Sequence, residues 1–327
     1  MGSEPARDGI DATRALVAQA VVGRERELDL ILAAVSARRD ILLEGPPGTS
    51  KSTLLRAIAA QWGIPLILVE GNADLTPGKL LGHHDPSRVL REDYSADNFV
   101  DGPLATAMRR GGFLYIEEFN RAPEDTLNTL LTAMAEREVT IPRAGVIRAL
   151  GTFRVIASMN PYDNVGTARL STSVHDRMCR LAVGYQDADA ELEIVRRRAG
   201  LDGRPADLAD QLRADAVALT RATREHPAIR QGSSVRGAID LTLVAGELVA
   251  MRGIADTGGD GRVTGADAYE GKAPTRDRYA ATVFDAMVVA LSGRIHPDET
   301  AGATPEQLLR EIWQDHFLLD RAVAAPG

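Results

Sequence analysis

The most informative stretch of the sequence reads Glu44-Gly45-Pro46-Pro47-Gly48-Thr49-Ser50-Lys51-Ser52. It follows the apolar run Ile41-Leu42-Leu43 and precedes a helical pattern over residues 53–59. A strand, a glycine-containing loop and a helix start in this order are the context of a phosphate-binding P-loop. The backbone N–H groups of such a loop and the N-terminus of the following helix form a concave anion site. The stretch therefore predicts that the chain binds a nucleoside triphosphate.

The side chains of this loop suit the phosphates and their metal ion. We expect Lys51 to reach the β- and γ-phosphates and the Ser52 hydroxyl group to hold Mg²⁺. Ser50 stands where a glycine usually precedes the lysine, which costs backbone freedom but keeps the charge, the hydroxyl group and the helix start. A chance glycine turn is the alternative, and the agreement of all three features argues against it. The expected nucleotide-binding residues are Gly45, Pro46, Pro47, Gly48, Thr49, Ser50, Lys51, Ser52 and Thr53.

Length and composition limit the classes of protein to consider. A chain of 327 residues suggests about two domains. The formal net charge of -8 argues against a dedicated nucleic-acid binder, which usually needs a basic face. The single cysteine, Cys179, excludes an internal disulfide and fits a reducing cytosol. We see neither a signal-peptide pattern nor an apolar run of about 18 residues, so we expect a cytoplasmic protein without a membrane span.

Strand patterns alternate with helical patterns in the first half of the chain. Residues 65–69, 113–116 and 153–159 are apolar runs of strand length, separated by helical spacings. This alternation predicts an α/β fold with a parallel sheet. Residues 139–147 predict a hairpin, which either lines a pore or belongs to the scaffold.

Polar residues follow two of these strands. Glu117 and Glu118 come after residues 113–116, and carboxylates at such a strand end lie in the crevice where α/β proteins bind ligands. We expect Glu117 to hold Mg²⁺ through water and Glu118 to orient or deprotonate the attacking water. Glu117 is longer than the usual aspartate. Asn160 follows residues 153–159, and its amide suits a contact with the γ-phosphate or the attacking water.

Several segments have a structural interpretation that we prefer to a functional one. Residues up to about 14 are expected to be poorly ordered, and His83-His84-Asp85 lies in a polar segment, 76–102, that we interpret as a surface loop or insertion. These three residues lack the spacing typical of a metal site. Residues 252–274 are rich in Gly and Asp, without the spacing of a calcium loop. Trp62 is expected to pack in the core.

Helical patterns dominate from about residue 187. They cover residues 190–198, 207–225, 235–251, 279–291 and 304–313. This half of the chain therefore predicts a small α-helical lid domain. We expect an N-terminal segment at 1–21, a nucleotide-binding core at 22–186 and a lid domain at 187–327.

Four motifs together resemble a MoxR-type AAA+ ATPase, a group close to the magnesium-chelatase ATPase subunit and to the CbbQ/NorQ and GvpN ATPases. The resemblance extends over about 22–248 and rests on residues 45–52, 117–123, 159–161 and 176–178, which read Gly-Pro-Pro-Gly-Thr-Ser-Lys-Ser, Glu-Glu-Phe-Asn-Arg-Ala-Pro, Met-Asn-Pro and Asp-Arg-Met.

The resemblance implies a role for each polar residue. Lys51 and Ser52 are implied to be the Walker A residues, Glu117 and Glu118 the Walker B pair, Asn160 sensor 1, Arg177 the arginine finger that reaches the neighbouring subunit, and Arg236 the sensor 2 arginine. An ion pair with Asp176 is the alternative for Arg177. A homo-oligomeric ring, typically a hexamer, is also implied.

The implied function is ATP hydrolysis that drives chaperone-like remodelling or maturation of a protein client. Metal-cofactor insertion into a metalloenzyme, together with a separate von Willebrand factor A-domain protein, is the form of this work common in the group. A nucleic-acid-directed motor is an alternative that the acidic net charge disfavours. A nucleotide-gated scaffold with little turnover is another, because Glu117 and Ser50 depart from the usual pattern.

Overall fold

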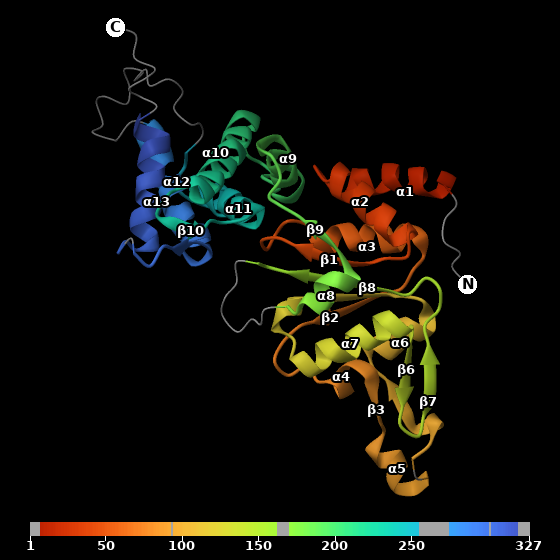
Figure 1. Cartoon of the computed structure of the whole chain (residues 1–327). Coiled ribbons are helices and arrows are strands. Elements are labelled where there is room, and N and C mark those ends of the chain that lie inside the picture. Colours follow the sequence, from red (N-terminus) through yellow and green to blue (C-terminus); the bar gives the residue numbers. More distant parts are fainter. Residues whose placement is uncertain (1–6, 93, 162–169, 255–274, 301, 320–327) are drawn as a thin grey trace, which may run out of the picture. The chain divides into compact units, whose positions relative to one another are not determined.

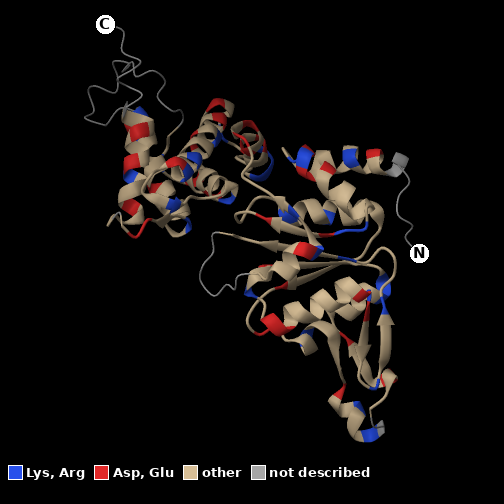
Figure 2. Cartoon of the chain, viewed as in Figure 1, with Lys and Arg blue, Asp and Glu red and all other residues tan. Residues whose placement is uncertain are grey.

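The computed structural model describes residues 7–92, 94–161, 170–254, 275–300 and 302–319. The chain divides into two compact units, Met1–Tyr185 and Gln186–Gly327. Lys and Arg residues are interspersed with Asp and Glu residues in both units (Figure 2). Among the described helices, none has the length and apolar character needed to cross a bilayer.

A five-stranded sheet forms the centre of the first unit. Its order is β2-β5-β8-β1-β9, and each neighbouring pair is parallel. The prediction of a parallel sheet is confirmed, whereas β9 had no counterpart among the predicted strands. The strands are β1 Asp40–Glu44, β2 Leu66–Glu70, β5 Phe113–Glu117, β8 Arg154–Met159 and β9 Met178–Ala182.

Helices cover both faces of this sheet (Figure 1). Successive residues of a strand point to opposite faces, so Leu42 and Leu43 belong to different apolar cores. The inner strands read as almost continuous apolar runs because both of their faces are buried. One layer contains α1 Arg7–Ala20, α2 Glu25–Ser36 and α3 Lys51–Trp62, and the other contains α6 Pro103–Arg110, α7 Glu124–Glu136 and α8 Thr172–Arg177.

The first helix includes residues that we expected to be poorly ordered. We predicted poor order up to about residue 14, but α1 starts at Arg7, so the prediction is wrong for residues 7–14, whereas residues 1–6 lie outside the described part of the chain. Val17 and Val21 are buried against the core of this layer. Trp62 donates a hydrogen bond to the Thr13 hydroxyl oxygen (Nε1···Oγ1 2.9 Å), which joins α3 to α1. The tertiary contact, rather than the local sequence, explains the longer helix.

The segment 76–102 contains regular structure, so its interpretation as a loop is wrong in part. A hairpin forms where β3 pairs antiparallel with β4, and the predicted hairpin of residues 139–147 is confirmed as β6 and β7. His84 packs edge-on against Tyr94 and Phe99, and its Nε2 lies 3.1 Å from the Pro142 carbonyl oxygen. The elements are α4 Pro77–Leu81, β3 Gly82–His84, α5 Pro86–Glu92, β4 Phe99–Asp101, β6 Glu138–Ile141 and β7 Gly145–Arg148.

The second unit is mainly helical, as the sequence predicts. Its largest core cluster gathers apolar side chains from the four helices α10 to α13. Residues 255–274 of the predicted Gly/Asp-rich segment lie outside the described residues. The elements are α9 Ala188–Arg198, α10 Ala206–Glu225, β10 Ile229–Gln231, α11 Val235–Met251, α12 Thr275–Leu291, β11 His296–Pro297 and α13 Pro305–Gln314.

A buried carboxylate links α9 to the start of α11. Glu191 is 1% exposed, and its two oxygens lie 2.8 Å from Arg224 Nη1 and 3.2 Å from Arg221 Nη1. Arg224 also donates through Nε to the Ser233 carbonyl oxygen (2.6 Å), in the turn before α11. Ser233 N–H in turn donates to Thr223 Oγ1 (2.9 Å). This network fixes the turn that presents the first residues of α11.

Glu191→Ala is expected to lower the free energy of unfolding by about 3–5 kcal/mol, because two arginines lose their buried partner. Urea denaturation followed by circular dichroism measures the change. Glu193→Ala is the matched control, since Glu193 pairs with Arg197 on the exposed face of the same helix (2.6 Å) and its loss should have little effect. Equal stability of the two variants would contradict a structural role for the Glu191 network.

Candidate nucleotide site

Two residues of the loop between β1 and α3 have a left-handed backbone conformation. Gly48 has φ 77° and Ser50 has φ 64°. A serine in this region carries strain of order 1 kcal/mol, which a glycine would not. The departure that we noted at residue 50 therefore leaves the loop conformation intact, because Ser50 adopts the conformation that glycine favours.

The Lys51 ammonium group folds back onto the loop. Its Nζ donates to the carbonyl oxygens of Gly45 (2.9 Å) and Pro46 (2.8 Å) and lies 3.1 Å from Thr49 Oγ1. The Thr49 hydroxyl group is buried and donates to the Pro46 carbonyl oxygen (3.0 Å). These contacts hold the ammonium group of Lys51 at the loop. A phosphate oxygen is a stronger partner for an ammonium group than a neutral carbonyl oxygen, so this position suits phosphate binding.

Gly45 lies where the chain has no room for a side chain. A Cβ atom at this position would lie 2.0 Å from the Val183 carbonyl oxygen. Main-chain hydrogen bonds hold the loop start between two neighbouring strands: Gly45 N–H donates to the Met159 carbonyl oxygen (3.0 Å) and Val183 N–H to the Glu44 carbonyl oxygen (2.7 Å). Glycine is therefore required by close packing of the backbone.

Gly45→Ala is expected to weaken ATP binding by at least about tenfold, because the loop must move away from Val183. Titration with a fluorescent ATP analogue measures the affinity. Gly184→Ala is the control on the same segment, since an added Cβ there meets nothing within 4 Å. Wild-type affinity of the Gly45 variant would show that the loop tolerates the displacement.

Ser52 and Glu117 meet at the carboxyl end of β5. The Ser52 hydroxyl group donates to Glu117 Oε1 at 2.5 Å. A hydroxyl oxygen and a carboxylate oxygen are hard donors of the kind that Mg²⁺ prefers. These two residues fit a magnesium ion at the phosphates, although Glu117 is longer than an aspartate.

A buried tyrosine lies behind this pair. Tyr115 is 1% exposed, and its hydroxyl oxygen lies 2.9 Å from Ser158 Oγ. Burial raises the pKa of Tyr115 to about 12, while the hydrogen bond with Ser158 partly offsets this rise and the charge of Glu117 adds to it. The hydroxyl group therefore keeps its proton at neutral pH. In the sequence, Tyr115 is recognisable only as part of an apolar strand.

Glu118 and Asn160 follow adjacent strands at the same edge of the sheet. Glu118 comes directly after β5 and has φ 52°, an uncommon conformation for a non-glycine residue that often marks functional sites. Its carboxylate is 45% exposed and lies 3.0 Å from Arg121 Nη1. Asn160 comes directly after β8, which lies between β5 and β1. Both residues therefore lie at the edge of the sheet from which the P-loop starts.

Arg177 lies at the opposite edge of the sheet, where strand β1 begins. It ends α8, and the next residue, Met178, pairs in register with Asp40 at the amino end of β1. The P-loop leaves β1 after Glu44, about 13 Å further along the strand at a rise of ~3.3 Å per residue. Among the described residues, Arg177 donates only to the Ser173 carbonyl oxygen (3.2 Å), with no ion pair to Asp176.

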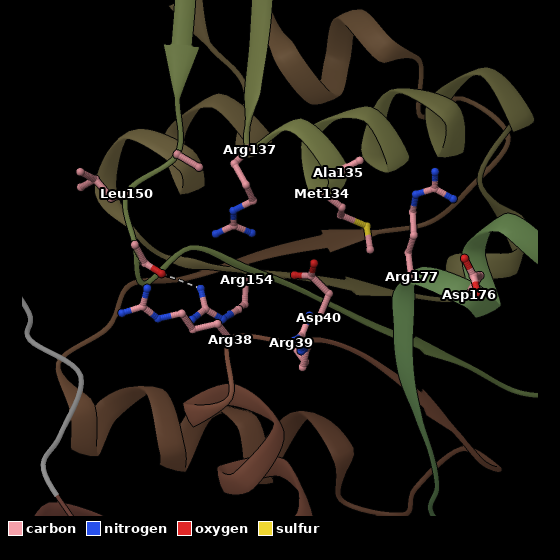
Figure 3. Close-up of a pocket in the computed structure, with 12 residues that line it drawn as sticks. Arg38, Arg39, Asp40, Met134, Ala135, Arg137, Leu150, Arg154, Asp176 and Arg177 are labelled. Atoms are coloured by element: carbon pink, nitrogen blue, oxygen red, sulfur yellow. Dashed lines mark hydrogen bonds between the residues drawn. The ribbon is translucent and has the colours of Figure 1, made fainter.

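Arginines line a cavity of about 600 Å³ beside Arg177 (Figure 3). Asp40 lies in its wall, where burial raises the pKa of the carboxyl group, while a hydrogen bond from Val155 N–H (2.7 Å) partly offsets this rise. Arg154 is 1% exposed and donates to the carbonyl oxygens of Gly151 and Phe153. The charged residues that line the cavity are Arg38, Arg39, Arg137, Arg154, Arg177, Asp40 and Asp176.

This cavity carries an excess of positive charge, so it suits an anion more than a cation. In Figure 3, Arg177 lies across the cavity from Arg38 and Arg154. Arg177 was predicted from the sequence but the cavity was not, because its arginines come from separate segments and only the folded sheet brings them together.

Comparison with known proteins identifies the family. Residues 40–178 match the AAA domain of the dynein-related subfamily. The matched region runs from the first residue of β1 to the first residue of β9, so it includes the P-loop, the Glu117-Glu118 pair, Asn160 and Arg177. The chain is an AAA+ ATPase.

Relatives place this AAA+ ATPase in the MoxR-like clade. The gas vesicle ATPase GvpN of Ancylobacter aquaticus is 28% identical over 232 residues, which are 65% of this chain and 62% of GvpN. CbbQ of Hydrogenophilus thermoluteolus is 31% identical over 183 residues, which are 55% of this chain and 66% of CbbQ. A solved ATPase candidate from Cytophaga hutchinsonii has a TM-score of 0.50 at 21% identity and covers 94% of both chains, which supports the fold.

The remaining predicted residue of this AAA+ ATPase lies in the second unit. Arg236 is the second residue of α11, and its side chain is exposed. Within the described part of the chain, it makes no hydrogen bond or ion pair. Arg177 thus lies at one edge of the sheet, and Arg236 belongs to the other unit. The opposite edge of the sheet carries the remaining predicted residues, which are Lys51, Ser52, Glu117, Glu118 and Asn160.

Proposed function

We propose that this AAA+ ATPase hydrolyses ATP in a homo-oligomeric ring in which Arg177 of each copy completes the site of its neighbour. The observation that carries this proposal is the position of Arg177 beside the amino end of β1, at the opposite edge of the sheet from the P-loop of its own chain. An arginine finger speeds hydrolysis by about 10³–10⁵-fold. A separate copy would therefore be a slow ATPase, and assembly would control the reaction.

Within one copy, each polar residue at the carboxyl edge of the sheet has its own role in the reaction. Lys51 binds the β- and γ-phosphates, and Ser52 and Glu117 hold Mg²⁺, with Glu117 acting through water. When bound, Mg²⁺ neutralises the charge that develops on the phosphates. Glu118 orients the attacking water and accepts its proton, while the Asn160 amide contacts the γ-phosphate or that water. We assign to Arg236 the sensor 2 role that the sequence resemblance implies.

The work that hydrolysis drives is remodelling or maturation of a protein client. The sequence resemblance supports this class of work, and the relatives include a gas vesicle ATPase. We propose that a separate von Willebrand factor A-domain protein and a metalloenzyme client take part, with metal-cofactor insertion as the outcome, as the sequence resemblance implies. The ring is a hexamer in this proposal.

A trapped assembly tests the proposed client. Glu118→Gln should retain ATP and hold the client, because only the water-activating carboxylate is lost. The variant is captured from its native lysate with ATP and Mg²⁺, and the bound proteins are identified by mass spectrometry. Lys51→Ala is the matched control, since it should fail to bind the nucleotide.

The result decides between the functions that the sequence left open. Enrichment of an A-domain protein or a metalloenzyme subunit over the Lys51 control supports client maturation. Nucleic acid or its processing enzymes in their place would overturn it and favour a nucleic-acid motor. Wild-type protein that binds ATP but shows no turnover, even with the captured partner, would indicate a nucleotide-gated scaffold.

A further inference from the structure

We propose that the cavity beside Arg177 is a second anion site, which binds a short phosphate chain of the di- or triphosphate kind. Its volume of about 600 Å³ falls within the ~300–1,000 Å³ typical of small-molecule sites. It lies at the amino end of β1, whereas the P-loop leaves the carboxyl end of that strand, so the two anion sites of one copy are separate. We call it the arginine cavity, after Arg38, Arg39, Arg137, Arg154 and Arg177.

The charge of the cavity wall favours an anion. Two aspartates, Asp40 and Asp176, line the cavity together with the five arginines. Burial raises the pKa of Asp40, and the charges of three lining arginines oppose this rise, so one carboxylate lies in the field of several cations. The helices α2 and α7 end beside the cavity, and each helix end adds about half a negative charge. The arginines outweigh these charges, and a concave site lined mainly by one sign of charge attracts the opposite sign.

Two of the arginines have backbone conformations that favour glycine. Arg38 follows the end of α2 with φ 61°, and Arg137 caps the end of α7 with φ 56°. Glycine is the usual residue where a helix ends in this left-handed conformation, because it has no Cβ atom. The helix dipole favours a cation at either helix end, but it does not explain why both side chains line one cavity. Uncommon conformations of this kind often mark binding sites.

Contacts with the protein hold the guanidinium groups in place. Arg137 donates through Nη2 to the Phe153 carbonyl oxygen (2.5 Å), and its guanidinium carbon lies 4.8 Å from the centre of the Phe153 ring. Arg177 reaches in from α8, across the cavity from Arg38 and Arg154 (Figure 3). A guanidinium group carries five N–H donors in a planar fork that matches phosphate oxygens. One carbonyl contact each therefore leaves Arg137 and Arg177 with donors for a phosphate chain.

Two sources can supply this chemistry. The first is a free small molecule that carries a phosphate chain and binds to a single copy. The second is the ATP of the neighbouring copy, which would bring its phosphates to Arg177, and this source alone rests on the proposed function. Either source assigns to the other cavity arginines the role of binding phosphate together with Arg177.

Inorganic tripolyphosphate tests the first source on single copies of the full chain. Lys51→Ala removes the P-loop site, and isothermal titration is done at a concentration where size-exclusion chromatography shows one copy. We expect one equivalent to bind. Arg38→Gly in this background should weaken binding by about tenfold or more, because a hydrogen bond to a charged group is lost while glycine keeps the left-handed backbone. Arg26→Ala, on the exposed surface near the amino end of α2, is the control and should bind normally.

The rate of ATP hydrolysis by the assembled protein tests the second source. Arg38→Gly, with Lys51 intact, should slow hydrolysis by about tenfold if the cavity takes the phosphates of the neighbour's ATP, and then single copies need not bind tripolyphosphate. The melting temperature of each variant is recorded, and Arg26→Ala should keep the wild-type rate. No binding by single copies together with an unchanged rate of the Arg38 variant overturns the inference.

The pattern of the variants separates a built site from general attraction between charges. Equal loss of tripolyphosphate binding in the Arg38 and Arg26 variants also overturns the inference, because it would indicate binding anywhere on the surface. The titration on single copies does not depend on a ring. Binding there, combined with a wild-type hydrolysis rate of the assembled Arg177→Ala variant, would therefore support the anion site and contradict the proposed function alone.

Discussion

Replacing Arg177 by alanine is expected to slow ATP hydrolysis by the assembled protein by about 10³–10⁵-fold, the effect of losing an arginine finger. ATP affinity of the isolated subunit should stay close to that of the wild type, because Arg177 lies at the sheet edge opposite the P-loop of its own chain. Steady-state phosphate release at concentrations where the ring forms measures the rate. Nucleotide titration at low protein concentration measures the affinity.

Arg14→Ala is the control for the loss of a surface arginine, since Arg14 forms an exposed ion pair with Asp29 (2.7 Å) on the outer helices. It should retain the wild-type rate. Size-exclusion chromatography checks that the Arg177 variant still assembles. A variant at position 177 that assembles and hydrolyses ATP at the wild-type rate would contradict the role that we propose for this residue.

The second large effect is expected at Glu118. Glu118→Gln should lower the hydrolysis rate by about 10²–10⁴-fold while ATP stays bound, because the amide cannot accept a proton from the attacking water. The strained backbone at this residue holds its side chain beyond the end of β5. Single-turnover measurements with ATP already bound isolate the chemical step from binding.

Glu124→Gln provides the matched change on an exposed acid in the first turn of α7. This control should hydrolyse ATP normally. If Glu118→Gln also retained most of its activity, the water-activating role would pass to another group, with Glu117 the nearest carboxylate in sequence.

Sequence alone predicted the parts of the site that are local. The P-loop combines a strand, a turn and a helix start within one short stretch, while Glu117 ends the apolar strand β5 and Asn160 directly follows β8. Such residues are found from patterns because each depends on its immediate neighbours. The parallel sheet then requires the carboxyl ends of β1, β5 and β8 to meet, which the pairing confirms.

The parts that were missed depend on contacts distant in sequence. Strand β9 reads Met-Cys-Arg-Leu-Ala, with most of its residues exposed at the edge of the sheet, so it lacks the apolar run of an inner strand. Pairing with β1 defines it. The hairpin of β3 and β4 likewise depends on aromatic packing around His84 and on its contact with Pro142. The arginine cavity joins α7, α8 and the starts of β1 and β8, which no local pattern brings together.

The two departures from the usual motif have different consequences in the structure. Ser50 accepts a left-handed conformation at a modest cost in strain, and the loop keeps its shape. Glu117 reaches Ser52 directly, at the carboxyl end of β5. Neither departure removes a group that phosphate or Mg²⁺ needs, so we expect turnover rather than nucleotide binding alone.

The most direct test of the central claim is to mix two inactive variants. Arg177→Ala keeps its own Glu118, and Glu118→Gln keeps its own Arg177, so a neighbouring pair can combine one intact group from each copy. If Arg177 acts on the neighbour, an equal mixture assembled at random should recover about a quarter of the wild-type rate per site. No recovery in mixtures that form mixed rings would contradict a site shared between copies.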